Sequence, residues 1–290
     1  MEKGLTVHKM KAEYKILGLD NVLLGECPVW DSNLNKVRYL DILGRKSITL
    51  CLESGNCEFT ELCEDTGALA ICEDTTLIYA ATTAVYDEQN NAICPFPKER
   101  GIRFNDGKPS PEGKFFVGSI EKGGNGALFC LENKNLYPVI EGVKISNGLY
   151  WSLDFKTFYF CDTATRKIVA YSYPEFKLIK TVIDFNEIDG FVGNPDGLCI
   201  DLDGNLWVSI WGGACVVNVD AQSGEILKKI DLPAKYISCP AFVGAKLDTL
   251  FITSAKENDE SEFAGKCFLV DAGVKGRKPF LFKNEHKLSK

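Results

Sequence analysis

A pattern repeated six times along the 290 residues constrains the fold of this chain more than any other feature. Each repeat has a short apolar stretch, a polar turn and a second run rich in β-branched and aromatic residues. Apolar and polar residues that alternate on both sides of a turn predict β-hairpins. The repeats begin at Pro28, Ala68, Lys108, Gly148, Gly197 and Cys239.

The spacing of these repeats predicts a specific all-β architecture. Their starts lie about 40–50 residues apart, and most hairpins are followed by a second one, which is the period of a four-stranded propeller blade. The sequence shows no convincing helical pattern. A β-sandwich is the alternative, but it does not readily explain six equal repeats. We therefore expect one domain over residues 1–290, a six-bladed β-propeller.

Histidine is scarce in this chain, and that scarcity limits its chemistry. The two histidines, His8 and His286, lie near the two ends. A buried Ser-His-Asp triad, a histidine-ligated zinc site or a histidine general base is therefore not expected. Any reaction must use carboxylates, amides, Arg, Lys or a metal bound through oxygen.

Charge and apolar patterning indicate the compartment and exclude some partners. The net charge is −7, and nucleic acids and anionic membranes both require a basic surface, so neither is an expected partner. No apolar run approaches the roughly 18–20 residues of a membrane span, and the first residues lack the apolar core of a secretory signal. The 12 cysteines form no C-x-x-C pair. These features predict a cytoplasmic protein with reduced thiols.

Polar residues recur at one position of the repeat, directly ahead of the predicted innermost strand. Because innermost strands begin at the propeller axis, we expect these side chains to converge there. Two or more buried carboxylates at one point require a cation or ordered water. Oxygen ligands suit Ca²⁺, with Mg²⁺ or Mn²⁺ as alternatives. The alternative interpretation is that Asn-Asp-Gly and Asn-Pro-Asp-Gly are simply turns. The residues are Glu26, Arg103, Asn105, Asp106, Asn147 and Asp196.

Several longer motifs resemble those of the regucalcin (senescence marker protein), gluconolactonase and luciferin-regenerating enzyme family. They occur in the family's order and span nearly the full chain. The resemblance implies a six-bladed propeller with one divalent metal at its axis, and hydrolysis of sugar lactones. The motifs are GECPVWD (25–31), RFNDGKPSPEGKFFVGS (103–119), SNGLYWS (146–152), NPDGLCIDLDGNLWVSIW (194–211) and LFITSA (250–255).

The resemblance also implies roles for individual residues. The family's metal ligands fall on Glu26, Asn147 and Asp196, and Asp196 is expected to act as the general base. Ca²⁺ is the expected ion, with Zn²⁺, Mn²⁺ or Mg²⁺ as alternatives.

Contacts to the substrate, a small sugar lactone, are expected from a second set of residues. These are Arg103, Asn105 and Asp106, with Glu121 at the pocket rim and Asn194 as an outer contact. Animal regucalcins carry an acidic residue after the Gly-Ser of the third blade, and here Glu121 is displaced by about two residues, so the sugar preference is open. The family also allows a non-enzymatic calcium-binding docking protein, a luciferin-regenerating activity, or phosphotriester hydrolysis as a side activity.

Overall fold

The computed structural model describes residues 8–10, 13–17, 22–121 and 123–284. His286 lies outside these residues. The described residues form 25 β-strands and three 3₁₀ helices of three residues each, η1 (Lys98–Arg100), η2 (Thr163–Thr165) and η3 (Phe185–Glu187). The prediction of an all-β protein is therefore confirmed. Within the described part of the chain, no helix is long and apolar enough to cross a membrane.

Four of the sheets have the same construction, with four antiparallel strands in chain order. The first holds β3 (Gly25–Asp31), β4 (Lys36–Asp41), β5 (Lys46–Leu50) and β6 (Cys57–Glu61). The second holds β7 (Thr66–Ile71), β8 (Leu77–Ala81), β9 (Ala84–Asp87) and β10 (Ala92–Pro95). The third holds β11 (Arg103–Pro109), β12 (Phe115–Ile120), β13 (Gly126–Glu132) and β14 (Asn135–Val143). The fourth holds β15 (Ser146–Trp151), β16 (Thr157–Asp162), β17 (Lys167–Ser172) and β18 (Leu178–Asp184).

The remaining strands form a nine-stranded sheet with two parts. A single residue pair, Trp211 with Tyr236, joins β20 to β23 and so connects the parts. One part holds β19 (Asn194–Ile200), β20 (Leu206–Trp211), β21 (Cys215–Val219), β22 (Ile226–Asp231) and β1 (His8–Met10). The other holds β23 (Tyr236–Val243), β24 (Thr249–Ala255), β25 (Cys267–Asp271) and β2 (Tyr14–Leu17).

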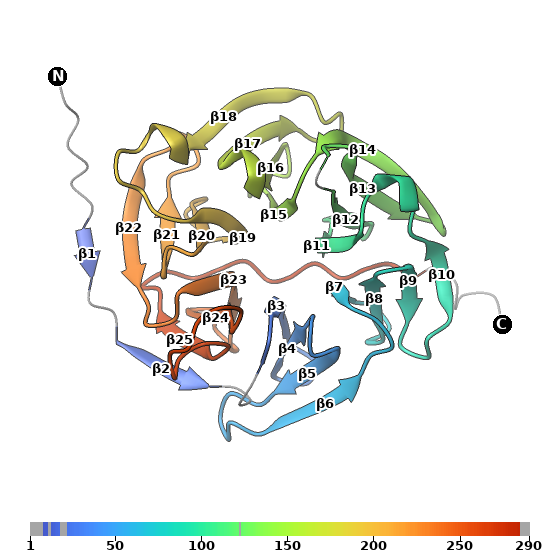
Figure 1. Ribbon diagram of the computed structural model, residues 1–290, viewed down its shortest axis with the longest axis horizontal. Helices are drawn as coiled ribbons and strands as arrows, with labels where there is room; N and C mark the ends of the chain where they lie inside the picture. The colour runs from blue at the N-terminus through green and yellow to red at the C-terminus, as the bar shows by residue number, and fades with distance from the viewer. Residues whose placement is uncertain (1–7, 11–12, 18–21, 122, 285–290) are drawn as a thin grey trace.

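The sheets surround a common axis, and the first strand of each predicted repeat lies innermost (Figure 1). The six predicted hairpins correspond to β3–β4, β7–β8, β11–β12, β15–β16, β19–β20 and β23–β24. This arrangement differs from the two face-packed sheets of a sandwich. The local turn and alternation signals therefore predicted the hairpins correctly.

Two strands from the start of the chain close the ring. β2 pairs antiparallel with β25, with Tyr14 opposite Val270, and β1 pairs parallel with β22. Residues far apart in sequence thus complete the last two groups of strands, which leaves fewer unpaired sheet edges.

The segment after β25 crosses the ring from the side of β22 to the side of β10 (Figure 1). It pairs with hairpin turns on both sides, through the bridges Gly276 to Asp201 and Phe282 to Cys72. The Lys283 N–H also donates to the Gly113 carbonyl over 2.8 Å. These turns follow the innermost strands, so the segment lies over the ends of those strands. We call residues 273–284 the C-terminal strap.

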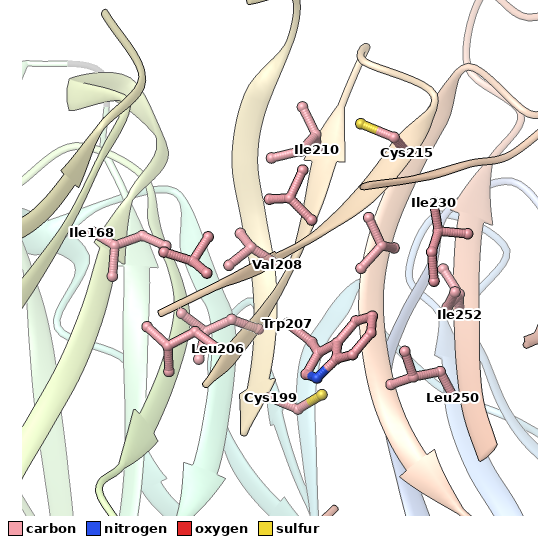
Figure 2. Packing of buried hydrophobic residues seen from close by; sticks show 14 of the residues in the cluster. Ile168, Cys199, Leu206, Trp207, Val208, Ile210, Cys215, Ile230, Leu250 and Ile252 are labelled. Carbon is pink, nitrogen blue, oxygen red and sulfur yellow. The ribbon is translucent and has the colours of Figure 1, made fainter. Parts of the chain in front are cut away.

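Apolar side chains fill the space between neighbouring sheets (Figure 2). Trp207 is fully buried there and packs edge-on against Phe242, with ring centroids 6.2 Å apart. Its indole N–H donates to Asp201 Oδ2 over 2.9 Å, so burial leaves no unsatisfied donor. All twelve cysteines are free thiols and most are buried, as expected for small apolar side chains.

Candidate metal and substrate site

Each of the six innermost strands contains a β-bulge near its first residues. The register shifts by one residue in every case, which places one extra residue on the inner strand. Bulges re-aim side chains and are frequent beside functional sites. The shifts lie between Glu26 and Val29, Thr66 and Ala68, Phe104 and Gly107, Ser146 and Leu149, Pro195 and Leu198, and Ile237 and Pro240.

Glycines at these bulges let neighbouring innermost strands approach each other closely. A Cβ added to Gly67 would lie 2.3 Å from the Phe104 carbonyl oxygen, and one added to Gly148 would lie 2.6 Å from that of Asp196. A Cβ on Gly197 would lie 2.4 Å from Cys239 Sγ. The Asn-Asp-Gly and Asn-Pro-Asp-Gly sequences lie within strands β11 and β19 and not in turns. The alternative interpretation of these sequences as turns is therefore wrong.

Three carboxylates lie near enough to affect one another's ionisation where the bulged strands converge. Glu26, Asp106 and Asp196 are each less than a tenth exposed. Burial, followed by the charge of Asp106, raises the pKa of Glu26 to about 8. Burial, followed by the charges of Glu26 and Asp106, raises the pKa of Asp196 well above its usual range. The three groups therefore repel one another when ionised, and they need a positive charge among them.

A chain of hydrogen bonds orients the two amides beside these carboxylates. Arg103 Nη1 donates to Asn105 Oδ1 over 2.8 Å, and Asn105 Nδ2 donates to Asn147 Oδ1 over 3.2 Å. Asn147 Nδ2 donates to Thr163 Oγ1 over 2.9 Å, and that hydroxyl donates to the Pro195 carbonyl over 2.8 Å. Because the Thr163 proton is used, the hydroxyl must accept from Asn147. The Asn147 amide oxygen is thereby directed toward Asn105.

The oxygen atoms of this cluster fit a hard divalent cation. Asp196 Oδ1 and Asp106 Oδ2 are buried without a hydrogen-bond partner, which is costly unless a ligand completes them. Among the described residues, no three His, Cys, Asp or Glu side chains form a metal-binding group. The predicted ligands Glu26, Asn147 and Asp196 contain only two such residues. Two carboxylates and an amide suit Ca²⁺ or a similar ion.

Two cations balance part of the negative charge. Arg103 is half-buried, and burial lowers its pKa. The charges of Glu26, Asp65 and Asp196 act in the opposite direction and raise it. Lys108 Nζ lies 3.5 Å from Asp106 Oδ1, and 17% of the Lys108 side chain is exposed. The sequence interpretation missed Lys108, although a charged residue two positions after Asp106 in a buried strand was a usable signal. It also missed Thr163, which no local pattern indicates.

The two residues predicted at the rim, Glu121 and Asn194, take no part in the hydrogen-bond chain of Arg103, Asn105 and Asn147. Glu121 follows β12 and is half-buried, and its Oε2 accepts the N–H of Asn125 over 2.8 Å. Hydrogen bonds from its own loop, chiefly that of Asn125, lower its pKa. Asn194 begins β19 opposite Trp211. The hydrogen bond from Asn125 holds Glu121 against its own loop. The structure brings together the other six predicted residues, which are Glu26, Arg103, Asn105, Asp106, Asn147 and Asp196.

Comparison with known proteins places these residues in a family. The model of the SMP-30/Gluconolactonase/LRE-like region matches residues 24–256. Regucalcin of Danio rerio is 32% identical over 284 residues, covering 89% of this chain and 94% of its own. Bacillus subtilis YvrE, named as a candidate sugar lactone lactonase, is 31% identical over 280 residues, covering 90% of this chain and 95% of its own.

A solved structure shares the fold. The calcium-binding protein regucalcin from Agrobacterium tumefaciens gives a TM-score of 0.85 at 24% identity, covering 95% of this chain and 99% of its own. That likeness supports a propeller-type arrangement of the sheets. The match of the family model to most of the chain, with the full-length relatives, confirms the family inferred from the motifs. The chain belongs to the SMP-30/gluconolactonase/LRE-like family.

Proposed function

We propose that this protein hydrolyses sugar lactones with the help of one divalent cation, most simply Ca²⁺, with Zn²⁺, Mn²⁺ or Mg²⁺ as alternatives. The observation that carries the proposal is the unpartnered, buried Asp196 Oδ1 beside Glu26 and Asp106. A buried carboxylate oxygen with no donor is ready for a cation or a water molecule. The lactonase-type members of the family supply the reaction class.

Glu26, Asn147 and Asp196 would hold the cation. When bound, it would polarise the lactone carbonyl and stabilise the negative charge that develops on the carbonyl oxygen. Asn147 would contribute its Oδ1, which Thr163 and Asn105 keep in place. A cation would also offset the repulsion among the three carboxylates.

The side chains of the third sheet would bind and orient the sugar. Arg103 keeps guanidinium N–H groups beyond those bonded to Phe104 and Asn105, and these can donate to ring hydroxyls. Asn105 and Asp106 lie beside it as further contacts. Glu121 remains a proposed contact at the rim, where its loop would have to release the Asn125 bond.

Asp196 would act as the general base. Its Oδ1 would accept a proton from a water molecule while the water oxygen attacks the carbonyl carbon. The ring C–O bond then breaks, and the proton passes from Asp196 to the departing ring oxygen, which yields the open hydroxy acid. One water is consumed and no other reactant is needed. Asp106 is the alternative base.

The proposal includes the number of blades. We take the two parts of the nine-stranded sheet as two blades. Among the described residues a single strand pair, Trp211 with Tyr236, links their ladders, and each part has its own bulged inner strand. With the four other sheets this makes a six-bladed propeller, one domain over residues 1–290. The acidic charge and the free thiols favour a cytoplasmic protein without nucleic-acid or membrane partners.

A second candidate function is a calcium-binding protein without catalysis, because several relatives are named regucalcin and the Agrobacterium protein is described as calcium-binding. A luciferin-regenerating activity would use the same site with another substrate. Neither explains as directly why Arg103 and two amides surround the carboxylates.

Asp196→Asn tests the proposal and separates the two candidates. It keeps the shape of the side chain but removes the base and one anionic ligand. We expect gluconolactone hydrolysis, measured by acid release, to fall at least 1000-fold at saturating Ca²⁺ or Mn²⁺. Asp203→Asn, in the β19–β20 turn, is the control and should retain full activity. Wild-type activity in Asp196→Asn would refute the mechanism. Metal binding by a wild-type protein inactive on all lactones would favour the non-enzymatic role.

A further inference from the structure

A cavity lies on the axis, farther along the innermost strands than the carboxylates. All six innermost strands line it, with residues that follow the bulges, such as Val29, Ile71, Tyr150 and Phe242. Arg277, Pro279 and Phe280 of the C-terminal strap line it as well. The segment that crosses the ring in Figure 1 therefore covers part of the cavity.

The negative charges along the axis are confined to one end of it. The carboxylates of Glu26, Asp106 and Asp196 lie at the bulges, whereas no Asp or Glu of the described residues lines this cavity. Its charged residues are Lys108 and Arg277. Lys108 occurs at the boundary, because it lines the cavity and also pairs with Asp106. A field of one sign in an apolar chamber favours an anion.

Three residues that line the cavity have hydrogen-bond donors with few described partners. Lys108 has three N–H donors, and its one described partner is Asp106 Oδ1 at 3.5 Å. Arg277 donates to the Leu153 carbonyl over 3.3 Å and lies 5.0 Å from the ring centroid of Phe280. The Tyr150 hydroxyl has no hydrogen-bond partner among the described residues. Burial raises the pKa of Tyr150, while the nearby charges of Lys108 and Arg277 act to lower it.

We propose that this cavity is a binding site for a short-chain monocarboxylate, separate from the lactone site. The carboxylate would accept hydrogen bonds from Tyr150 and Arg277, with Lys108 as a nearby positive charge. Its alkyl part would contact apolar side chains such as Val29 and Phe242. The cavity volume is about 50 Å³. An apolar cavity of about 150 Å³ holds a benzene molecule, so the ligand has the size of acetate and a sugar acid is excluded.

Thermal unfolding in sodium acetate tests this site. The protein is first freed of metal with a chelator and dialysed, so that the carboxylate cluster cannot bind acetate through a cation. Melting temperatures are measured against acetate concentration, with sodium chloride at equal ionic strength and acetamide as the neutral analogue. We expect a saturable rise with acetate that acetamide does not produce, because a ligand that binds only the folded state stabilises it.

Three variants locate the effect. Arg277→Met should abolish the acetate-specific rise, and any residual increase measures the general effect of acetate on stability. Tyr150→Phe removes one hydroxyl and should weaken acetate binding about five-fold. Glu26→Gln, at the other end of the axis, should leave the rise unchanged. If Arg277→Met does not fold, ¹³C-acetate line broadening in the wild type and in Tyr150→Phe provides the same comparison.

Two kinds of result would overturn the proposal. One is an equal rise with acetamide, or no acetate-specific rise in the wild type. The other is a rise that Arg277→Met and Tyr150→Phe leave unchanged, or that Glu26→Gln removes. Neither outcome depends on lactone hydrolysis, so this proposal and the proposed function can fail independently.

Discussion

Asn105 Nδ2 donates a hydrogen bond to Asn147 Oδ1 over 3.2 Å, across the two innermost strands β11 and β15. This bond joins a residue expected to bind substrate to one expected to bind metal. The other end of the Asn147 amide is fixed by Thr163. The amide oxygen therefore keeps its direction only while both neighbours hold the amide.

Thr163→Val should weaken metal binding without removing a ligand. Valine has nearly the same shape but can neither accept the Asn147 N–H nor donate to Pro195. We expect a 10- to 100-fold loss of Ca²⁺ or Mn²⁺ affinity, the usual effect of losing a residue that orients a ligand. Calorimetric titration measures it. Thr165→Val is the control, because the Thr165 hydroxyl donates to the Asp162 carbonyl outside this network. Equal affinities in the two variants would contradict the role of Thr163.

Glu26 should make the metal-free protein less stable as the pH rises. Its pKa is about 8 in the folded protein, against an ordinary value of 4.5. The folded state therefore holds a proton that the unfolded state has released. The resulting stabilisation is complete below about pH 4.5 and is lost as the pH rises through about 8.

Glu26→Gln removes this dependence, and urea unfolding of the chelated protein checks it. We expect the free energy of unfolding to fall from pH 5 to pH 8.5 in the wild type, and to fall clearly less in the variant. Near pH 8.5 the variant should be the more stable of the two. Parallel pH profiles would show that Glu26 is ionised in the folded protein, contrary to this expectation.

Arg103→Met should separate substrate binding from metal binding. Arg103 donates to Asn105 and to its neighbour's carbonyl, and it is not a metal ligand. We expect kcat/KM for a lactone to fall at least 100-fold, because a buried charge-assisted contact is worth about 1.5–3 kcal/mol and orientation adds to it. Metal affinity should stay within a few-fold. Arg100→Met, which breaks an ion pair with the exposed Glu141, is the control. A matching loss of metal affinity would instead indicate collapse of the site.

The hairpins, and the position of the candidate site residues within each repeat, could be predicted because both depend on local sequence. Turn residues and alternation define each hairpin, and six copies at one period define the ring. Glu26, Asn147 and Asp196 were found because they occupy the same position in their repeats. The resemblance to a family then assigned their roles.

Features that depend on contacts between repeats could not be predicted in the same way. A bulge is a mismatch between two strands, so the sequence of Asn105 and Asp106 alone suggested a turn. The pairing of β2 with β25 joins the two ends of the chain. The strap has no alternation, and its place follows from the bridges made by Gly276 and Phe282.

Gly67→Ala should show that the convergence of the innermost strands requires glycine. Gly67 has an ordinary backbone conformation, so strain in φ is not the reason. Its added Cβ would lie 2.3 Å from the Phe104 carbonyl oxygen and 2.7 Å from Asn105 Cα, both backbone atoms that cannot rotate away. β11 must therefore move, and it carries Arg103, Asn105 and Asp106. We expect a loss of about 1–3 kcal/mol in the free energy of unfolding, measured in urea, together with lower lactone hydrolysis.

Gly123→Ala is the matched control for this substitution. Its added Cβ would come no closer than 3.1 Å, to an oxygen of the flexible Glu121 side chain. It should change stability by less than about 0.5 kcal/mol. If Gly67→Ala were as stable and as active as this control, the space between β7 and β11 would be large enough for an added Cβ. The glycine at that bulge would then have no part in bringing the carboxylates together.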